Sequence, residues 1–221
     1  MTEQQLTEEK FAYLRSRMVD DQIVRRGIND PDVIDAMRTV PRHLFIPDKY
    51  RSEAYKDGPV PIGAGQTISQ PFIVASMTEE LEIDSTSKVL EIGTGCGYQT
   101  AVLAEIADHI YSIELVPELY RMASETLRHL HYDQVQIRLG DGSRGWIEEA
   151  PFDAIIVTAA APQVPRHLID QLGVGGRMIL PVETGLGRQE LVRVVRTPET
   201  VKQSVLYEVR FVPMQGEIDE H

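Results

Sequence analysis

The chain has 221 residues, 42% hydrophobic and 25% charged, which is enough to bury a sizeable core but short for two full domains. Its one cysteine, Cys96, excludes an internal disulfide and a cysteine-cluster zinc site, and the formal net charge of −12 disfavours a nucleic-acid partner. No apolar run reaches the length of a membrane span and the first residues carry no secretory signal, so we expect a cytoplasmic protein without a membrane partner.

Residues 1–60 predict a helical region. Apolar side chains recur here at spacings of three and four residues, as they do on the buried face of a helix. Asp30 stands where an N-cap is expected, with Pro31 just inside the helix that follows. Residues 61–87 then predict a loop and a helix, because the polar, glycine-rich run GAGQTISQ precedes the apolar segment PFIVASM.

Residues 88–182 alternate short apolar strands with helical stretches. The strands are KVLEIG, HIYSIEL, VQIRL, DAIIVTAA and GRMILPV. Strand and helix in repeated alternation predict a doubly wound, mostly parallel α/β sheet with helices on both faces. Residues 183–221 alternate apolar and polar positions without a helix between them, which predicts antiparallel strands at the sheet edge. We therefore expect a single domain over residues 1–221.

The strongest chemical signal is EIGTGCG, residues 91–97, at the end of the first of these strands. Ligands of open α/β sheets bind beside such a turn, where glycines let the ligand approach the backbone. Tyr98 stands where a dinucleotide fingerprint has its third glycine, which disfavours a pyrophosphate ligand. The E-x-G-x-G-x-G form instead resembles the first motif of class I methyltransferases that use S-adenosylmethionine, and this implies a Rossmann-like fold.

The next strand ends support a nucleoside ligand. Glu114 ends the second strand 19 residues beyond Gly95 and can accept hydrogen bonds from both ribose hydroxyls, although it would do the same for NAD. Asp141 can accept from an adenine amino group, although an Asp-Gly turn alone would also explain it. The predicted cofactor-binding residues are Glu91, Gly93, Thr94, Gly95, Gly97, Glu114, Leu115, Asp141, Gly142 and Thr158.

A second motif, PIGAGQTISQPFIVASMTEEL, lies upstream of the glycine turn. It resembles the signature of the protein-L-isoaspartate O-methyltransferase family. The segments MVDDQIVRRGI, AMRTVPRHLFIP, GDGSRGW, APFDAIIVTAAAPQVP and VRFVPMQGE resemble that family in the same order, from about Met18 to Gly216. The first 17 residues and the tail EIDEH look lineage-specific.

The resemblance implies an enzyme that methylates the free α-carboxylate of L-isoaspartyl residues in damaged proteins and peptides, with D-aspartyl residues as candidate further substrates. The methyl donor is S-adenosylmethionine, the product is S-adenosylhomocysteine, and no metal is needed. Ser69 is then the catalytic residue, in a monomer. The surrounding substrate-binding residues are Thr67, Ile68, Gln70, Phe211, Val212 and Pro213.

Several other interpretations stay open at this point. Ser69 could instead cap the helix that begins near Pro71. The enzyme could be a class I methyltransferase for a small carboxylic acid. From other functional classes, a nicotinamide-dependent oxidoreductase or a non-catalytic nucleoside-binding module would keep the glycine turn but would have no use for GQTISQP.

Overall fold

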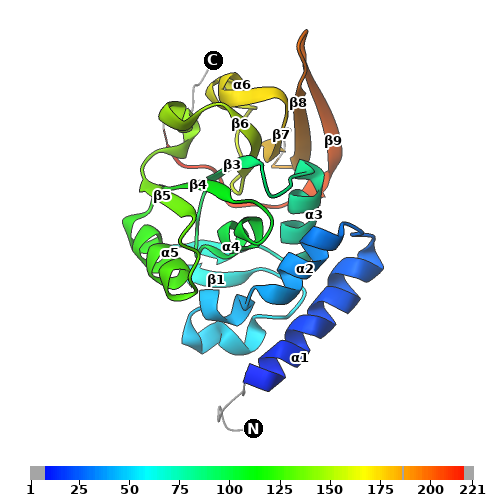
Figure 1. The fold of residues 1–221 in the computed structure, drawn as a ribbon, viewed down its shortest axis with the longest axis vertical. Helices are drawn as coiled ribbons and strands as arrows, with labels where there is room; N and C mark the ends of the chain where they lie inside the picture. Colours follow the sequence, from blue (N-terminus) through cyan, green and yellow to red (C-terminus); the bar gives the residue numbers. More distant parts are fainter. Residues whose placement is uncertain (1–7, 186, 217–221) are drawn as a thin grey trace.

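The computed structural model describes residues 8–185 and 187–216, and Figure 1 shows how they surround a central sheet. The acidic tail at 217–221 and the start of the N-terminal extension at 1–7 lie outside these ranges. Within them, no helix combines the length and the apolar character needed to cross a membrane.

The central sheet has seven strands in the described part of the chain, in the order β5-β4-β3-β6-β7-β8-β9. Strands β3 to β7 pair in parallel, whereas β8 is antiparallel to both of its neighbours. The predicted parallel sheet and its antiparallel edge are thus confirmed. The bounds are Lys88–Ile92 for β3, His109–Glu114 for β4, Val135–Leu139 for β5, Phe152–Val157 for β6, Leu172–Glu183 for β7, Gln189–Arg196 for β8 and Val201–Val209 for β9.

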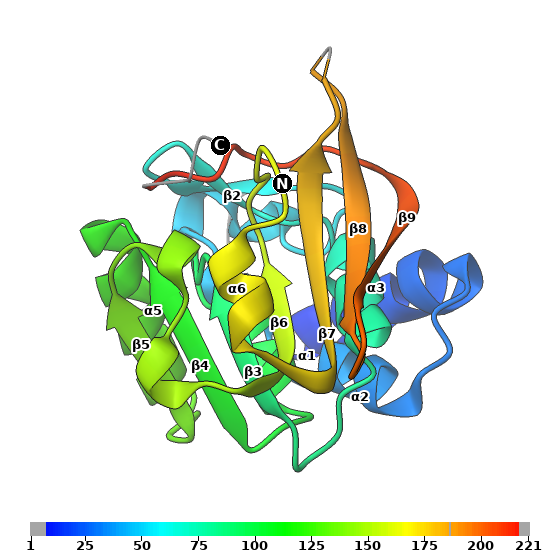
Figure 2. The same ribbon diagram turned by 90° about the horizontal axis from the view of Figure 1, so that it is seen from above.

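Helices cover both faces of this sheet, as Figure 2 shows. Alternate strand residues point to opposite faces, so Val89 packs with α3 and α4, whereas its neighbour Leu90 packs with α6. Both faces are therefore apolar, which is why the strands read as continuous hydrophobic runs. The helix bounds are Pro71–Leu81 for α3, Tyr98–Ala104 for α4, Pro117–His129 for α5 and Arg166–Gln171 for α6.

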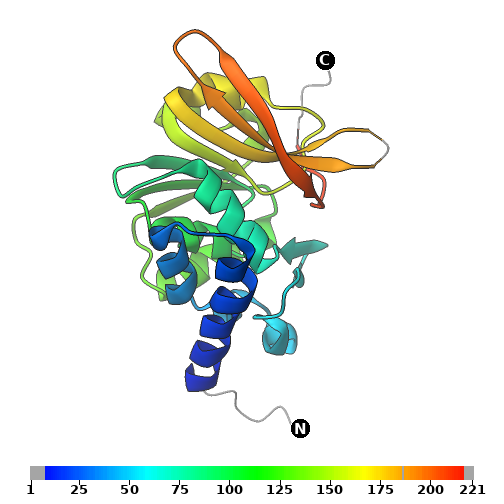
Figure 3. The same cartoon turned by 90° about the vertical axis from the view of Figure 1, so that its right-hand side faces the viewer.

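The N-terminal region packs at the end of the molecule away from the β8–β9 hairpin (Figure 3). It contains α1, Glu8–Met18, and α2, Pro31–Thr39, followed by short helical turns at Arg42–Phe45 and Asp48–Glu53. The Asp30 side chain accepts from two backbone N–H groups of the first turn of α2, so the predicted N-cap is confirmed.

The segment before α3 differs from the predicted loop. Val60–Gly63, β1, pairs antiparallel with Gln66–Ile68, β2, to form a small hairpin. The two residues between them, Ala64 and Gly65, both have positive φ, 50° and 73°, as a tight two-residue hairpin turn requires. An alanine at the first turn position gave no hairpin signal, because asparagine or glycine is the usual residue there.

Candidate active site

A pocket opens where the carboxyl ends of β3, β4 and β6 meet the β1–β2 hairpin. Strands β4 and β6 lie on either side of β3, so this is the point where successive crossovers turn in opposite directions and ligands bind. The enclosed space, including its open mouth, is about 880 Å³. Most of the predicted residues line it: Gly93, Thr94, Gly95, Glu114, Leu115, Gly142, Thr158, Thr67, Ile68, Ser69, Val212 and Pro213.

Thr158, just after the end of β6, is hydrogen-bonded to the glycine turn that follows β3. The Thr158 hydroxyl donates to the Gly93 carbonyl at 2.7 Å and to the Ile92 carbonyl at 3.1 Å. A Cβ on Gly93 would lie 2.5 Å from the Thr158 Oγ1, and Gly93 has φ 95°. Gly95, with φ 57°, continues the turn. A side chain is thus excluded at Gly93 and would be strained at Gly95, so the backbone forms this part of the pocket wall.

Glu114 is held in place by backbone donors. One carboxylate oxygen accepts from Gly95 N–H at 2.7 Å and the other accepts from Val116 N–H at 2.9 Å. The residue is 5% exposed and lines the pocket. A carboxylate oxygen has room for a second donor, so this oriented group can accept hydrogen bonds from the two hydroxyls of a ribose. The pocket therefore fits a nucleoside.

Glu91 does not line the pocket, which differs from the direct cofactor contact expected from the motif. It is fully buried below the turn, where one oxygen accepts from Thr100 at 2.5 Å and from Ser112 at 2.6 Å. Ser112 in turn hydrogen-bonds Thr94 at 2.6 Å, and Thr94 reaches the pocket. Burial raises the pKa of the Glu91 carboxyl to about 8, because burial penalises the charged form.

Two further residues of the predicted cofactor set also lie outside the pocket lining. Gly97 is the residue before α4, and its N–H donates to the Thr94 carbonyl at 2.9 Å. Asp141 accepts from Ser143 N–H at 2.9 Å and caps the short turn after β5, while its neighbour Gly142 lines the pocket.

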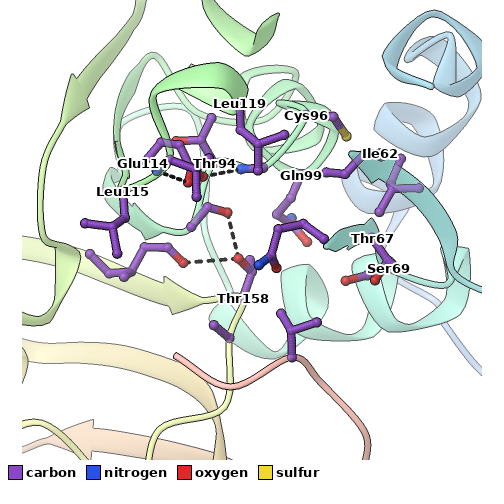
Figure 4. Close-up of a pocket in the computed structure, with 18 of the residues that line it drawn as sticks. Ile62, Thr67, Ser69, Thr94, Cys96, Gln99, Glu114, Leu115, Leu119 and Thr158 are labelled. Atoms are coloured by element: carbon purple, nitrogen blue, oxygen red, sulfur yellow. Dashed lines mark hydrogen bonds between the residues drawn. The ribbon is translucent and has the colours of Figure 1, made fainter. Parts of the chain in front are cut away.

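The expected substrate residues gather beside the nucleoside pocket (Figure 4). In that view Glu114 and Leu115 lie on one side of the pocket and Thr67 and Ser69 lie on the other. A second depression adjoins the first and shares Thr67, Ser69, Thr158 and Val212 with it. The remaining residues around the second depression are Pro59, Gln70, Ile73, Glu208, Val209, Arg210 and Phe211.

The chain after β9 closes this second depression against the end of β6. Ala160 N–H donates to the Val212 carbonyl at 2.8 Å, and Met214 N–H donates to the Ala160 carbonyl at 2.7 Å. The segment that carries Phe211 to Pro213 is thus fixed next to Thr158, although it lies more than 50 residues later in the sequence. The two depressions form one continuous site.

The alternative role of Ser69 as a helix cap is wrong. The residue before α3 is Gln70, no side chain caps the helix, and Pro71 occupies its first turn. The Ser69 side chain therefore lines the site without holding the helix.

Sequence reasoning missed several lining residues. Gln66 comes from the hairpin that was expected to be a loop, and Gln99 and Leu119 come from the first turns of α4 and α5. The first turn of a helix that follows a binding-site strand faces the ligand, which could have indicated the last two. The described residues contain no group of three or more histidine, cysteine or acidic side chains that could hold a metal ion.

The family described as Protein-L-isoaspartate(D-aspartate) O-methyltransferase (PCMT) matches residues 14–219 of this chain. Protein-L-isoaspartate O-methyltransferase 1 of Syntrophobacter fumaroxidans is 52% identical over 206 residues, which cover 93% of this chain and 96% of the relative. The protein-L-isoaspartate O-methyltransferase of a Picosynechococcus species is 51% identical over 203 residues, covering 92% and 90%.

Solved structures give the same result. A protein-L-isoaspartate O-methyltransferase superposes with a TM-score of 0.83 and 27% identity, covering 96% of this chain and 67% of its own. A Plasmodium falciparum protein assigned to the same activity was solved in complex with S-adenosyl-L-homocysteine. It superposes with a TM-score of 0.80 and 27% identity, covering 91% of this chain and 98% of its own.

We predict that Glu114→Gln weakens the binding of S-adenosylhomocysteine. The amide keeps the size of the side chain but removes the charge and one acceptor, which costs about 1.5 to 3 kcal/mol, or about ten- to a hundredfold in affinity. Titration calorimetry measures this, with Glu125→Gln on the exposed face of α5 as a control that should bind like the parent. Unchanged affinity in a folded Glu114→Gln protein would remove Glu114 from the ligand site.

Glu91 gives a prediction about pH. The folded protein keeps this carboxyl protonated up to about pH 8, whereas the ordinary pKa is 4.5, so between these values the folded state binds more protons than the unfolded chain. The stabilisation that comes from this difference in proton binding is complete at pH values below 4.5. Between 4.5 and about 8, the free energy of unfolding falls by on the order of 1 kcal/mol per pH unit. Glu91→Gln should therefore gain stability relative to the parent between about pH 5 and pH 8 in denaturant unfolding. Parallel pH profiles of the two proteins would contradict this.

Proposed function

The chain belongs to the protein-L-isoaspartate(D-aspartate) O-methyltransferase family, and from this membership we propose how the residues of its site share the reaction. The protein is an S-adenosylmethionine-dependent protein-L-isoaspartate O-methyltransferase with the class I methyltransferase fold. It methylates the free α-carboxylate of L-isoaspartyl residues in damaged proteins and peptides, which begins their repair.

The nucleoside pocket fits S-adenosylmethionine, which supplies an electrophilic methyl group when bound. Glu114 would hold the ribose hydroxyls, because both of its oxygens are already oriented by backbone donors. Gly93, Gly95 and Gly142 would let the ligand lie against the backbone. Glu91 and Asp141 would act from outside the pocket lining, by supporting the turns that carry these glycines.

The reaction needs positioning more than proton transfer. A substrate carboxylate is already ionised at neutral pH and is itself the nucleophile. The titratable groups of the pocket lining are Glu114, Cys96 and Tyr98. Burial raises the pKa of Cys96 to about 11 and that of Tyr98 to about 12, so both are neutral at pH 7. The lining of this pocket thus offers no general base apart from Glu114, which its backbone donors hold in place, and the adjoining depression adds the carboxylate of Glu208.

We assign the orientation of the substrate carboxylate to Ser69. Its hydroxyl is a neutral donor that can hold one carboxylate oxygen without neutralising it. The observation that carries this assignment is that Ser69 lines both depressions, where a group bound in the second would face the ligand of the first. Thr67, Ile68 and Gln70 would shape this end, and Phe211 to Pro213 would border the bound peptide.

Four finer features of the function remain predictions. The net charge of −12 disfavours a nucleic-acid partner. The monomeric state and the cytoplasmic location are expectations from the sequence. D-Aspartyl residues are candidate further substrates, as the name of the matching family suggests.

One peptide made in isoaspartyl and aspartyl versions tests the substrate assignment. We expect labelled methyl groups to pass from the cofactor to the isoaspartyl version and not to the aspartyl version, because only the former presents the α-carboxylate in this geometry. A small carboxylic acid serves as the competing substrate. Faster methylation of the acid than of the isoaspartyl peptide would favour the alternative enzyme.

Ser69→Ala should reduce turnover without weakening cofactor binding. One lost charge-assisted hydrogen bond predicts methylation of the isoaspartyl peptide at least roughly tenfold slower. The melting temperature should stay near that of the parent, because Ser69 does not cap α3. Steady-state kinetics, calorimetry with S-adenosylhomocysteine and thermal melts measure the three quantities.

Ser69→Thr is the matched control for this substitution. Its hydroxyl survives with an added methyl group, so part of the activity should remain. Parental turnover in Ser69→Ala would leave the orientation of the carboxylate to backbone donors alone.

A further inference from the structure

Arg42 is a buried cation behind the Ser69 segment. Its residue is 0% exposed, Nε donates to the Ala54 carbonyl at 2.7 Å, and one terminal nitrogen donates to the Ser69 carbonyl at 2.7 Å. The other terminal nitrogen, Nη1, is buried and has no hydrogen-bond partner among the described residues. Among the described residues, no carboxylate forms an ion pair with Arg42, so the positive charge of its guanidinium is not neutralised locally.

A cation in this position costs stability. Burial lowers the pKa of the Arg42 guanidinium, because the charged form is taken out of water, yet arginine stays protonated at neutral pH. The guanidinium carbon lies 4.7 Å from the centroid of the Tyr98 ring, and this cation–π contact compensates in part for the lost hydration of the charge. An apolar side chain would fill the same volume at lower cost, so packing alone does not account for the residue.

The contact with the Ser69 carbonyl fixes the peptide plane between Ser69 and Gln70. The peptide bond between Ser69 and Gln70 is trans, because the one cis peptide bond among the described residues joins Ala150 and Pro151. In a trans peptide the C=O and N–H groups point in opposite directions. The Gln70 N–H therefore points away from Arg42.

The site borders the Ser69–Gln70 segment and not Arg42. Ser69 and Gln70 both line the second depression, whereas Arg42 lines neither. No described residue accepts a hydrogen bond from the Gln70 N–H. The residue that carries this N–H is also held on its other side, because the carbonyl of Gln70, which belongs to the next peptide plane, accepts from Ile73 and Val74 in α3, and the Gln70 side chain donates to Asp57 at 2.7 Å. A fixed, unused backbone donor thus stands next to the Ser69 hydroxyl.

We propose that Arg42 is a positioning residue of the reaction, which holds the Ser69–Gln70 peptide plane so that the Gln70 N–H and the Ser69 hydroxyl bind the two oxygens of the substrate carboxylate. This inference rests on the substrate role proposed above for Ser69. The guanidinium also polarises the peptide group through its carbonyl, which strengthens the N–H as a donor. Its positive charge further favours an anion at this end of an acidic protein.

Arg42→Lys tests the proposal while keeping the charge. An ammonium group is a point donor and cannot reproduce the planar fork that spans two carbonyls. We expect kcat/KM for the isoaspartyl peptide to fall about tenfold or more, with the affinity for S-adenosylhomocysteine within about twofold of the parent. Arg196→Lys is the control, because Arg196 also donates to main-chain carbonyls, those of Ile169, Asp170 and Leu172, but lies away from the site. Parental kcat/KM in Arg42→Lys would overturn the proposal.

Gln70→Pro removes the N–H directly and leaves Arg42 untouched. Gln70 has φ −51°, which proline can adopt, and Gln70→Ala is the reference because it loses the same contact with Asp57. We expect Gln70→Pro to have kcat/KM about tenfold below that of Gln70→Ala. Equal values for the two variants would show that the N–H does not bind substrate and would overturn the proposal, even if Arg42→Lys failed to fold.

A double-mutant cycle separates this inference from the assignment of Ser69. If Arg42 acts through the Gln70 N–H, Arg42→Lys combined with Gln70→Pro should lose less than the product of the two single losses. Losses that multiply would mean that Arg42 acts independently of this N–H, and the proposal would be wrong. Parental turnover in Ser69→Ala, with Arg42→Lys impaired, would instead contradict the role of the Ser69 hydroxyl and leave the backbone donor in place.

Discussion

The hydrogen bond from Gly95 N–H to the Glu114 carboxylate joins the ends of β3 and β4, and the nucleoside half of the site depends on it. A carboxylate at a strand end is free to rotate unless donors orient it. Here the donors are backbone N–H groups, so the glycine turn and the carboxylate proposed to hold the ribose are fixed by one contact. The glycine turn also depends on the absence of a side chain at Gly93. There the hydroxyl of Thr158, at the end of the neighbouring strand β6, donates to the Gly93 carbonyl.

The substrate half is built on a different principle, since it comes from segments outside the parallel strands. The short link between β2 and α3 presents Ser69, and the chain after β9 presents Val212 and Pro213. Both are held by main-chain contacts, one through Arg42 and the other through Ala160. The two halves meet at Thr158, which lines both depressions. A methyl donor and a carboxylate can therefore be brought together by rigid elements, as a reaction without a general base requires.

The parts of the fold that could be predicted from sequence are those in which local pattern and burial agree. Strands buried on both faces appear in the sequence as apolar runs, so the sheet could be predicted. Ligands of such sheets bind at the carboxyl ends of the strands, so the position of Glu114 beside the pocket could be predicted as well. Asp30 followed from its position before Pro31, because capping is a local interaction.

The remainder depends on geometry that spacing does not contain. The motif gave the position of Glu91 but not the direction of its side chain, which points below the turn toward Thr100 and Ser112. The hairpin before α3 depends on a positive φ at Ala64, which alanine does not indicate. The contact of Arg42 with the Ser69 carbonyl joins residues 27 positions apart, and only the tertiary structure shows it.

The most direct test of this account is a crystal structure of the protein with S-adenosylhomocysteine and an isoaspartyl peptide bound together. The account predicts the ribose hydroxyls on the Glu114 carboxylate. It also predicts the α-carboxylate of the isoaspartyl residue within hydrogen-bonding distance of both the Ser69 hydroxyl and the Gln70 N–H. A nucleoside bound without Glu114, or a peptide carboxylate placed away from the Ser69 segment, would contradict it.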